Sequence, residues 1–251
     1  MTKRSISPAN RRGWKPVARF ARMLLIGMCA TLAGGCNTTN FSSLNTLDLP
    51  EGGGTLLLMP MDVEVNLLTA GGALQPKAEW TTKALDNLSA SIDNYALGKG
   101  LEFEDYEAPD PSHANYALFN EVISLHGAVG NAILQHKYTV PLPTKKNTFD
   151  WSLGPDVRSL PSDSPADYAL FIYYRSNYAS GGRIFATFAA ALVGFPLAGP
   201  RKAGFASLVD MRTGDIVWFN YLRGTADDVR DPERADFVVR SLLKGLPSSG
   251  T

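Results

Sequence analysis

The stretch Gly204-Phe-Ala-Ser-Leu-Val-Asp-Met-Arg-Thr-Gly-Asp-Ile-Val-Trp218 decides how the second half of this chain folds. Runs of apolar, β-branched and aromatic residues predict two strands, over 204–211 and 214–222. Between them, Arg212-Thr213-Gly214 predicts a three-residue hairpin loop in which Gly214 takes the left-handed backbone position. The sequence therefore predicts an antiparallel pair of strands here.

An earlier stretch predicts a parallel part of the same sheet. The range 55–65 begins with an apolar run, as in a strand covered on both faces, and then alternates between apolar and acidic residues. Apolar residues at helical spacing predict a helix over 77–97 that stops at Gly98, and 101–106 predicts a second strand. This strand–helix–strand order predicts two parallel strands joined by a crossover.

The remaining elements complete the predicted fold. We expect a helix over 115–135, with His126 near its apolar face, and an aromatic-rich strand over 167–174. Asp231 followed by Pro232 predicts the capped start of a final helix. The fold class expected is therefore α/β: a small mixed sheet with flanking helices, in a single domain over 55–247.

The N-terminal region predicts export and lipidation. The first 22 residues carry seven basic and no acidic residues, and a short apolar run follows that ends at Cys36. Leu32-Ala33-Gly34-Gly35-Cys36 resembles the bacterial lipobox, in which the cysteine is acylated and becomes the first mature residue. Cys29 competes less well because it follows the large Met28, and an ordinary secretory signal with an incidental cysteine is the other alternative.

This pattern divides the chain into three parts. We expect a lipoprotein signal peptide over 1–35, a lipidated Cys36 with a flexible tether over 36–54, and the folded domain over 55–247. In lipobox proteins an Asp after the cysteine commonly retains the protein at the inner membrane, so Asn37 points to the outer membrane. The expected location is the cell envelope, at the outer membrane and facing the periplasm, with the acyl chains as the contact to the membrane.

Charge and cysteine content exclude several functions for the mature part. The whole chain has 24 basic and 24 acidic residues, but removing the seven basic residues of the signal leaves 17 basic residues against 24 acidic ones. An acidic domain is a poor partner for nucleic acid, so none is expected. With Cys29 removed and Cys36 acylated, no disulfide and no cysteine nucleophile remain.

The hairpin also resembles a known group of envelope lipoproteins. That group comprises relatives of the curli-secretion lipoprotein CsgG, the penicillin-binding-protein activator LpoB and the amino-terminal domain of TolB. A strand ending in Leu-Val-Asp, a Thr-Gly turn and a strand ending in Trp recur there, as they do here over 208–218. The resemblance implies an α/β sheet flanked by helices and a role in secretion, envelope assembly or enzyme activation. It implies no catalytic or ligand-binding residue.

The range 184–198 departs from that group and has no charged residue. It is too short, and too interrupted by Gly194 and Pro196, to span a bilayer alone. We expect a helix buried in the core, because helices without a polar face usually belong there. The alternative is an exposed apolar flap that meets a membrane or a partner.

No motif for catalysis or metal binding stands out. The chain lacks Gly-x-Ser-x-Gly and His-Glu-x-x-His, and its three histidines lack metal-ligand spacing. The acidic residues of 227–236 alternate with arginines, which indicates a paired, solvated face. We therefore expect no enzyme, no cofactor and no metal. The expected function is a non-catalytic envelope lipoprotein that binds a protein partner or assists assembly or trafficking. The alternative is a self-associating component of a secretion or transport assembly, and a hydrolase is least expected.

Overall fold

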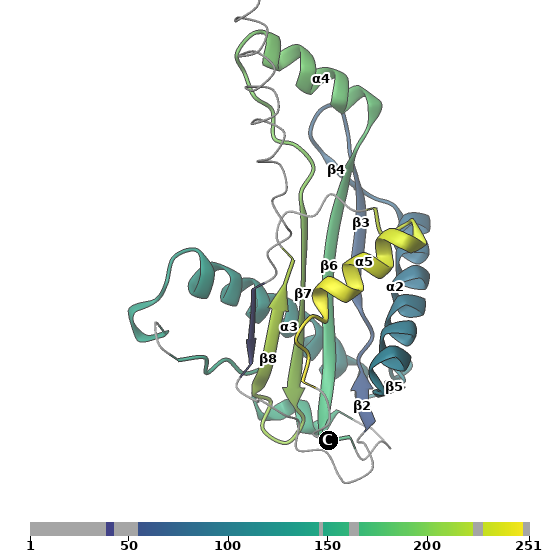
Figure 1. The fold of residues 1–251 in the computed structure, drawn as a ribbon, viewed down its shortest axis with the longest axis vertical. Coiled ribbons are helices and arrows are strands. Elements are labelled where there is room, and N and C mark those ends of the chain that lie inside the picture. Colours follow the sequence, from purple (N-terminus) through teal and green to yellow (C-terminus); the bar gives the residue numbers. More distant parts are fainter. Residues whose placement is uncertain (1–38, 43–54, 146–147, 161–165, 223–227, 248–251) are drawn as a thin grey trace, which may run out of the picture. The chain divides into compact units, whose positions relative to one another are not determined.

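The described strands belong to one eight-stranded sheet, and four α-helices accompany it (Figure 1). The strands are β1 (Thr39–Ser42), β2 (Thr55–Leu58), β3 (Asp62–Leu68), β4 (Leu74–Pro76), β5 (Glu102–Asp105), β6 (Tyr168–Ala179), β7 (Lys202–Asp210) and β8 (Ile216–Tyr221). The helices are α2 (Ala78–Lys99), α3 (Tyr116–Tyr138), α4 (Gly181–Leu192) and α5 (Pro232–Leu242), with short 3₁₀ turns at Pro143–Lys145 and Pro155–Ser159.

This computed structural model describes residues 39–42, 55–145, 148–160, 166–222 and 228–247, with the backbone alone at 39–42 and 55. The chain divides into two units, Met1–Cys36 and Asn37–Thr251, and every described residue belongs to the second. The expected signal peptide over 1–35, Cys36 itself and most of the expected tether lie outside the described residues.

The sheet is mixed, as the sequence predicted. Its order is β1-β8-β7-β6-β2-β5, and β3 pairs with both β6 and β4. The long β6 runs parallel to β2 and β3 and antiparallel to β7. The β2–α2–β5 segment gives a parallel pair, because β5 lies alongside β2. The expected fold class, a single α/β domain with helices flanking a small mixed sheet, is confirmed.

The range 55–65 forms two strands rather than one. Leu58 pairs with Leu170 of β6, and Asp62 pairs with Tyr173 of β6. Between these two pairs the segment from β2 to β3 advances four residues, whereas β6 advances three. The extra residue makes a bulge around Pro60, which has no N–H to give to the ladder. A shift of one residue exchanges the two faces of a strand. Leu58 and Val63 therefore pack in the same core although one position is even and the other odd.

Each face of the sheet has its own core. Helices α2 and α5 cover one face, where the core includes Leu88, Ile92 and Trp218. Helix α3 covers the other face, where Phe119, Ile133 and several aromatic side chains of β6, β7 and β8 are buried. The predicted helix ends are close, but α2 continues past Gly98 to Lys99. The left-handed turn that ends it lies at Gly100, with φ 63°.

The predicted hairpin of β7 and β8 is confirmed. Gly214 has φ 80°, and its N–H donates to the carbonyl oxygen of Asp210 at 2.7 Å. The Asp210 carboxylate accepts the N–H of Arg212 at 2.8 Å, so the side chain stabilises the turn that the backbone makes. The final helix is also confirmed, because the Asp231 side chain caps α5 by accepting the N–H of Arg234.

One strand lies where the sequence analysis expected a tether. Within the expected tether of 36–54, Thr39–Ser42 pairs antiparallel with β8 as β1. The apolar periodicity that reveals a buried strand is absent from these residues, because an edge strand is held by backbone hydrogen bonds to its one neighbour. The expectation of a tether is therefore wrong for these four residues.

Candidate functional site

Beyond the three helices that cover the sheet, β6 and its neighbours continue as an arm (Figure 1). We define the arm as residues 62–76 and 174–203, which contain β3, β4, α4 and the facing parts of β6 and β7. Helix α2 still covers the base of the arm, where Val63, Val65 and Tyr174 are in the core. Its tip consists of the β3–β4 turn (69–73) and residues 180–201, with α4 between the ends of β6 and β7. The arm tip is the candidate functional site, for the reasons that follow.

Helix α4 forms where the sequence changes from strand-forming to helix-forming residues. Ser180 begins it by accepting the N–H of Arg183 at 3.1 Å on its hydroxyl oxygen. Alanines, which have the highest helix propensity, fill much of its interior. The helix ends at Leu192, and Gly194 follows with the left-handed φ of 82°.

The arm tip exposes large apolar side chains. Those with 63–73% of their surface exposed are Ile184, Phe185, Phe188, Leu192, Val193 and Phe195. The residues of α4 turned toward the arm are small or polar, because Arg183 alone is buried and Ala186, Thr187 and Ala190 are half-buried. The expectation that 184–198 is a helix buried in the core is therefore wrong. The segment is exposed, as the alternative expected, and its contact with a membrane or a partner stays a prediction.

The physical reason is the position of α4 in the fold. Its composition suits a core, but the strands carry it past the ends of α2, α3 and α5, where no apolar layer formed by the described residues covers it (Figure 1). Isolated apolar residues are common on protein surfaces, whereas clustered aromatic and aliphatic side chains mark a binding surface. The arrangement is suited to burying apolar area against another molecule.

A buried arginine supports this exposed helix. The guanidinium of Arg183 donates to the carbonyl oxygen of Ala198 at 2.5 Å and to that of Ala70 at 3.5 Å. It also lies against Gly72, where a Cβ would be 3.3 Å from Nη1. One side chain thus joins α4, the β3–β4 turn and the chain that returns to β7. Sequence analysis missed this residue, because its partners are backbone atoms far away in the sequence.

The arm also differs in charge from the rest of the domain. Residues 168–209 contain four basic residues, Arg175, Arg183, Arg201 and Lys202, and no acidic one. The β3–β4 turn has no charged residue at all. Arg201 is exposed, and Lys202 lies with its ammonium 4.6 Å from the centroid of the Tyr178 ring. The arm tip is therefore apolar and basic, whereas the expected mature chain as a whole is acidic.

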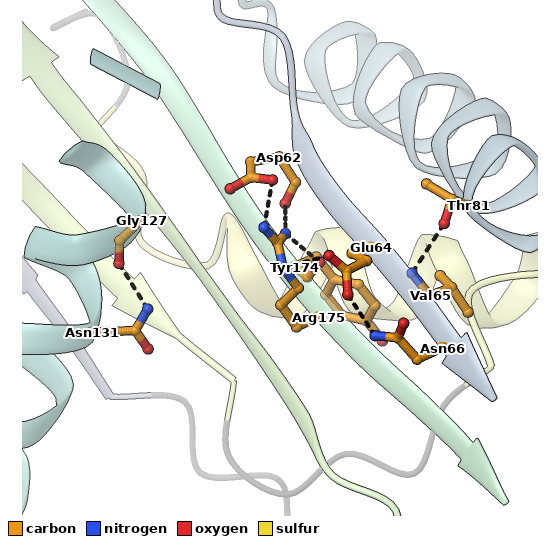
Figure 2. Close-up of polar contacts among 9 residues, drawn as sticks. All are labelled: Asp62, Glu64, Val65, Asn66, Thr81, Gly127, Asn131, Tyr174 and Arg175. Atoms are coloured by element: carbon orange, nitrogen blue, oxygen red, sulfur yellow. Dashed lines mark hydrogen bonds and ion pairs between the residues drawn. The ribbon is translucent and has the colours of Figure 1, made fainter. Parts of the chain in front are cut away.

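Polar contacts between β3 and β6 stiffen the base of the arm (Figure 2). Arg175 donates to the Asp62 carboxylate at 2.7 Å and to the Asp62 carbonyl oxygen at 2.7 Å, and its Nε lies 3.9 Å from Glu64 Oε2. The guanidinium also lies 4.3 Å from the centroid of the Tyr173 ring. Asn66 donates to Glu64 at 2.7 Å and to Asn177 at 3.2 Å. The bulge at Pro60 turns these polar side chains of β3 to the face that α3 covers further along the sheet.

His126, which the sequence analysis placed near the apolar face of its helix, is a buried packing residue. Its Nε2 lies 3.0 Å from Ser207 Oγ, and its ring packs between Phe171 and Phe205. Burial lowers the pKa of the imidazole to about 3, so the ring is neutral at physiological pH. His126 and Ser207 are 1% and 0% exposed, so neither can touch a substrate in this conformation.

Three of the described acidic residues of 227–236, Asp228, Asp231 and Asp236, have structural partners. Asp228 binds Arg230 through two hydrogen bonds of 2.6 and 2.8 Å, and these bonds lower the carboxyl pKa to about 2. The Arg230 guanidinium in turn lies 4.2 Å from the Trp80 ring and 4.0 Å from the Tyr178 ring. Asp236 pairs with Arg240 at 2.7 Å. Asp227 and Arg223 lie outside the described residues.

Within the described residues, no three His, Cys, Asp or Glu side chains gather in a way that could hold a metal ion. By length and composition, α3 is the one described helix that could cross a membrane. Its Phe119, Val122 and Ile133 side chains are buried in the core beneath the sheet, which is the packing of a core helix. Cys36, the expected lipidation site, lies outside the described residues.

Comparison with known proteins adds little to this description. No protein-family model matches the sequence, and no curated protein matches it. Among solved structures, the PelC dodecamer from Paraburkholderia phytofirmans covers 86% of this chain and 100% of its own, at 9% identity and a TM-score of 0.39. A PelC variant from the same organism gives the same coverage, with 10% identity and a TM-score of 0.36. Likenesses at this level place the chain in no family.

Proposed function

We propose that this chain is a non-catalytic lipoprotein of the bacterial cell envelope that acts by docking its arm tip onto another envelope component. The observation that carries the proposal is the exposed apolar surface of α4 and the residues after it. A domain of this size has enough core to keep such side chains inside. These side chains are instead held exposed on the arm. We therefore infer that another molecule covers this surface when the protein functions.

The sequence supports the envelope location and the anchor. The envelope location is supported by the basic N-terminal region, the apolar run after it and the lipobox pattern at Cys36. The resemblance of the hairpin to the CsgG, LpoB and TolB group agrees with this location. A non-catalytic role is proposed because the candidate catalytic groups have structural roles. His126 is buried among aromatic rings, and Asp228 and Asp231 are held by an ion pair and a helix cap.

Site-specific crosslinking in cells tests the docking role. A photoreactive amino acid at Phe188 or Phe195 should form adducts with a protein or with lipid. The same amino acid at Leu97, which is 80% exposed on α2, serves as the control. Adducts at all three positions alike, or at none of them, would contradict the proposal. Adducts to a second copy of the chain would identify self-association as the way in which the surface is covered.

Membrane fractionation tests the anchor separately. Cys36→Ala should remove the acylation site and shift the protein from the membrane to the soluble fraction, because the acyl chains supply most of the membrane affinity. Cys29→Ala is the matched control and should leave the fractionation unchanged. Membrane association that survives in the Cys36→Ala variant and acylation that is lost in the Cys29→Ala variant would each count against the lipobox assignment.

A further inference from the structure

We infer that the arm tip docks onto a lipid bilayer, specifically onto the membrane that holds the acylated Cys36, with α4 lying in the interface. This inference rests on the proposed function and names the partner of the same surface. Three independent features of the described chain carry it: the direction of β1, the distances along the strands, and the distribution of charge.

The first feature is the direction in which the chain enters the domain. Thr39, the first residue of β1, pairs with Tyr221, which pairs with Phe205, which pairs with Tyr173. These four residues lie side by side across the sheet and form one row. From this row, β1 runs away from the arm, whereas β6 runs into it. The chain before Thr39 therefore joins the sheet at the end from which the arm extends. The chain that leads from the expected anchor therefore enters the sheet at Thr39, beside the base of the arm.

The second feature is the agreement in length. Cys36 precedes Thr39 by three residues, a chain that reaches at most about 11 Å. Measured from the same row, Ser176 lies three residues further along β6, or about 10 Å, and Ala179 lies six residues further, or about 20 Å. Helix α4 begins beyond Ala179. Helix α4 therefore begins about 10 Å beyond the furthest level that Cys36 can reach. It can thus reach a bilayer that holds the acyl chains of Cys36.

The third feature is the order of residue types along the arm. Lys202 pairs with Ser176, at the depth that Cys36 can reach, and the Asn177 N–H donates to the Arg201 carbonyl oxygen, so Arg201 lies one residue further out. Tyr178 lies two residues beyond Ser176, or about 7 Å further out, and the Lys202 ammonium is 4.6 Å from the centroid of its ring. Beyond them come Phe185, Phe188 and Phe195. Basic and aromatic residues at the level of the headgroups, followed by apolar residues, is the arrangement of an interfacial helix.

The charge of the arm is complementary to a bilayer surface that carries anionic headgroups. The acidic residues of the arm, Asp62 and Glu64, lie at its base beside Arg175, and residues 174–203 contain no acidic residue that would repel anionic headgroups. A basic side chain near an anionic surface contributes about 1 kcal/mol, which is about a fivefold change in affinity. The ligand chemistry inferred is therefore acyl chains together with phosphate-bearing headgroups.

The test uses the purified, lipidated full-length product, reconstituted into vesicles of phosphatidylethanolamine and phosphatidylglycerol. The mature chain has no cysteine besides Cys36, so Phe188→Cys and Phe195→Cys each introduce a single thiol for a fluorescent label. Nitroxide-labelled lipids should quench both labels several-fold more than a label at Leu97→Cys, an exposed site on α2. Quenching that is equal at the three positions would overturn the inference.

A charge variant tests the headgroup contact. In phosphatidylglycerol vesicles Arg201→Gln should weaken docking of the arm, measured by the quenching at position 188, by about fivefold. Arg240→Gln, at an exposed position on α5, is the matched control and should leave the quenching unchanged. Protein adducts in cells combined with unquenched labels in vesicles would overturn the membrane inference and leave the docking proposal standing. The absence of both adducts and quenching would overturn both.

Discussion

The Nη2 atom of Arg183 lies 2.5 Å from the carbonyl oxygen of Ala198, fifteen residues further along the chain. This hydrogen bond closes the loop that contains α4 and the apolar residues after it. Because the same guanidinium reaches the carbonyl oxygen of Ala70, it also ties the loop to the β3–β4 turn. The exposed apolar surface is thus held in one arrangement by a buried charge.

Replacing this arginine should loosen the arm tip without unfolding the domain. In Arg183→Met the apolar stem keeps its packing, but the carbonyl oxygens of Ala198 and Ala70 lose a charged donor. We expect faster chymotrypsin cleavage after Phe188 in limited proteolysis and a melting temperature close to that of the parent. The exposed Arg201→Met is the control. Equal cleavage rates in the two variants would show that Arg183 does not brace the loop.

The close approach of α3 to the sheet predicts a large effect from a small substitution. A Cβ at Gly130 would lie 2.0 Å from the ring of Phe205, so Gly130→Ala requires the helix to move. We expect it to lower the free energy of unfolding by about 1–3 kcal/mol, as overpacking does. Gly98→Ala is the control, because a Cβ there meets nothing within 4 Å. Urea denaturation should show a gain of up to about 1 kcal/mol for that helical position, and a loss comparable to that of Gly130→Ala would contradict the packing argument.

The buried His126 predicts a loss of stability in mild acid. Its pKa is lowered to about 3, so below the unfolded-state value of 6.5 the unfolded chain binds a proton that the folded chain excludes. Stability should therefore be complete above about pH 6.5 and fall by about 1.4 kcal/mol per pH unit below it. His126→Phe should remove this slope between about pH 6 and pH 4.5, before the loss from Asp228 begins near pH 4.

The measurement for His126 is chemical denaturation over that pH range, and the readout is the slope rather than the stability at a single pH. The matched control is His113→Gln, because His113 is exposed. That variant should keep the parent slope. If His126→Phe also keeps the slope, another group causes the acid sensitivity.

The ion pair at the base of the arm should contribute more than an ion pair on the surface. Asp62 and Arg175 are 26% and 28% exposed, and the guanidinium also packs on Tyr173. A double-mutant cycle with Asp62→Asn and Arg175→Gln should give a coupling of about 1 kcal/mol. The same cycle on Asp236 and Arg240, which are 37% and 62% exposed, should give about 0.3–0.5 kcal/mol. Equal couplings would mean that solvent screens both pairs alike.

Much of the fold follows from local patterns. The hairpin at Gly214, the cap at Asp231 and the apolar face of α2 were predictable because each depends on residues that are neighbours in the sequence. The division of 55–65 into two strands was not predictable. The bulge at Pro60 shows only in the pairing with β6, more than a hundred residues away.

The sequence by itself determined the types of the elements, the mixed α/β class and the expected anchor at Cys36. Hydrophobic period, caps and turn residues act over a few positions and need no knowledge of distant contacts. The tertiary structure alone decided that 184–198 is exposed. Composition describes what a helix could bury, whereas burial depends on which elements reach it. Here the strands of the arm carry α4 beyond every helix of the core, and Arg183 holds it there.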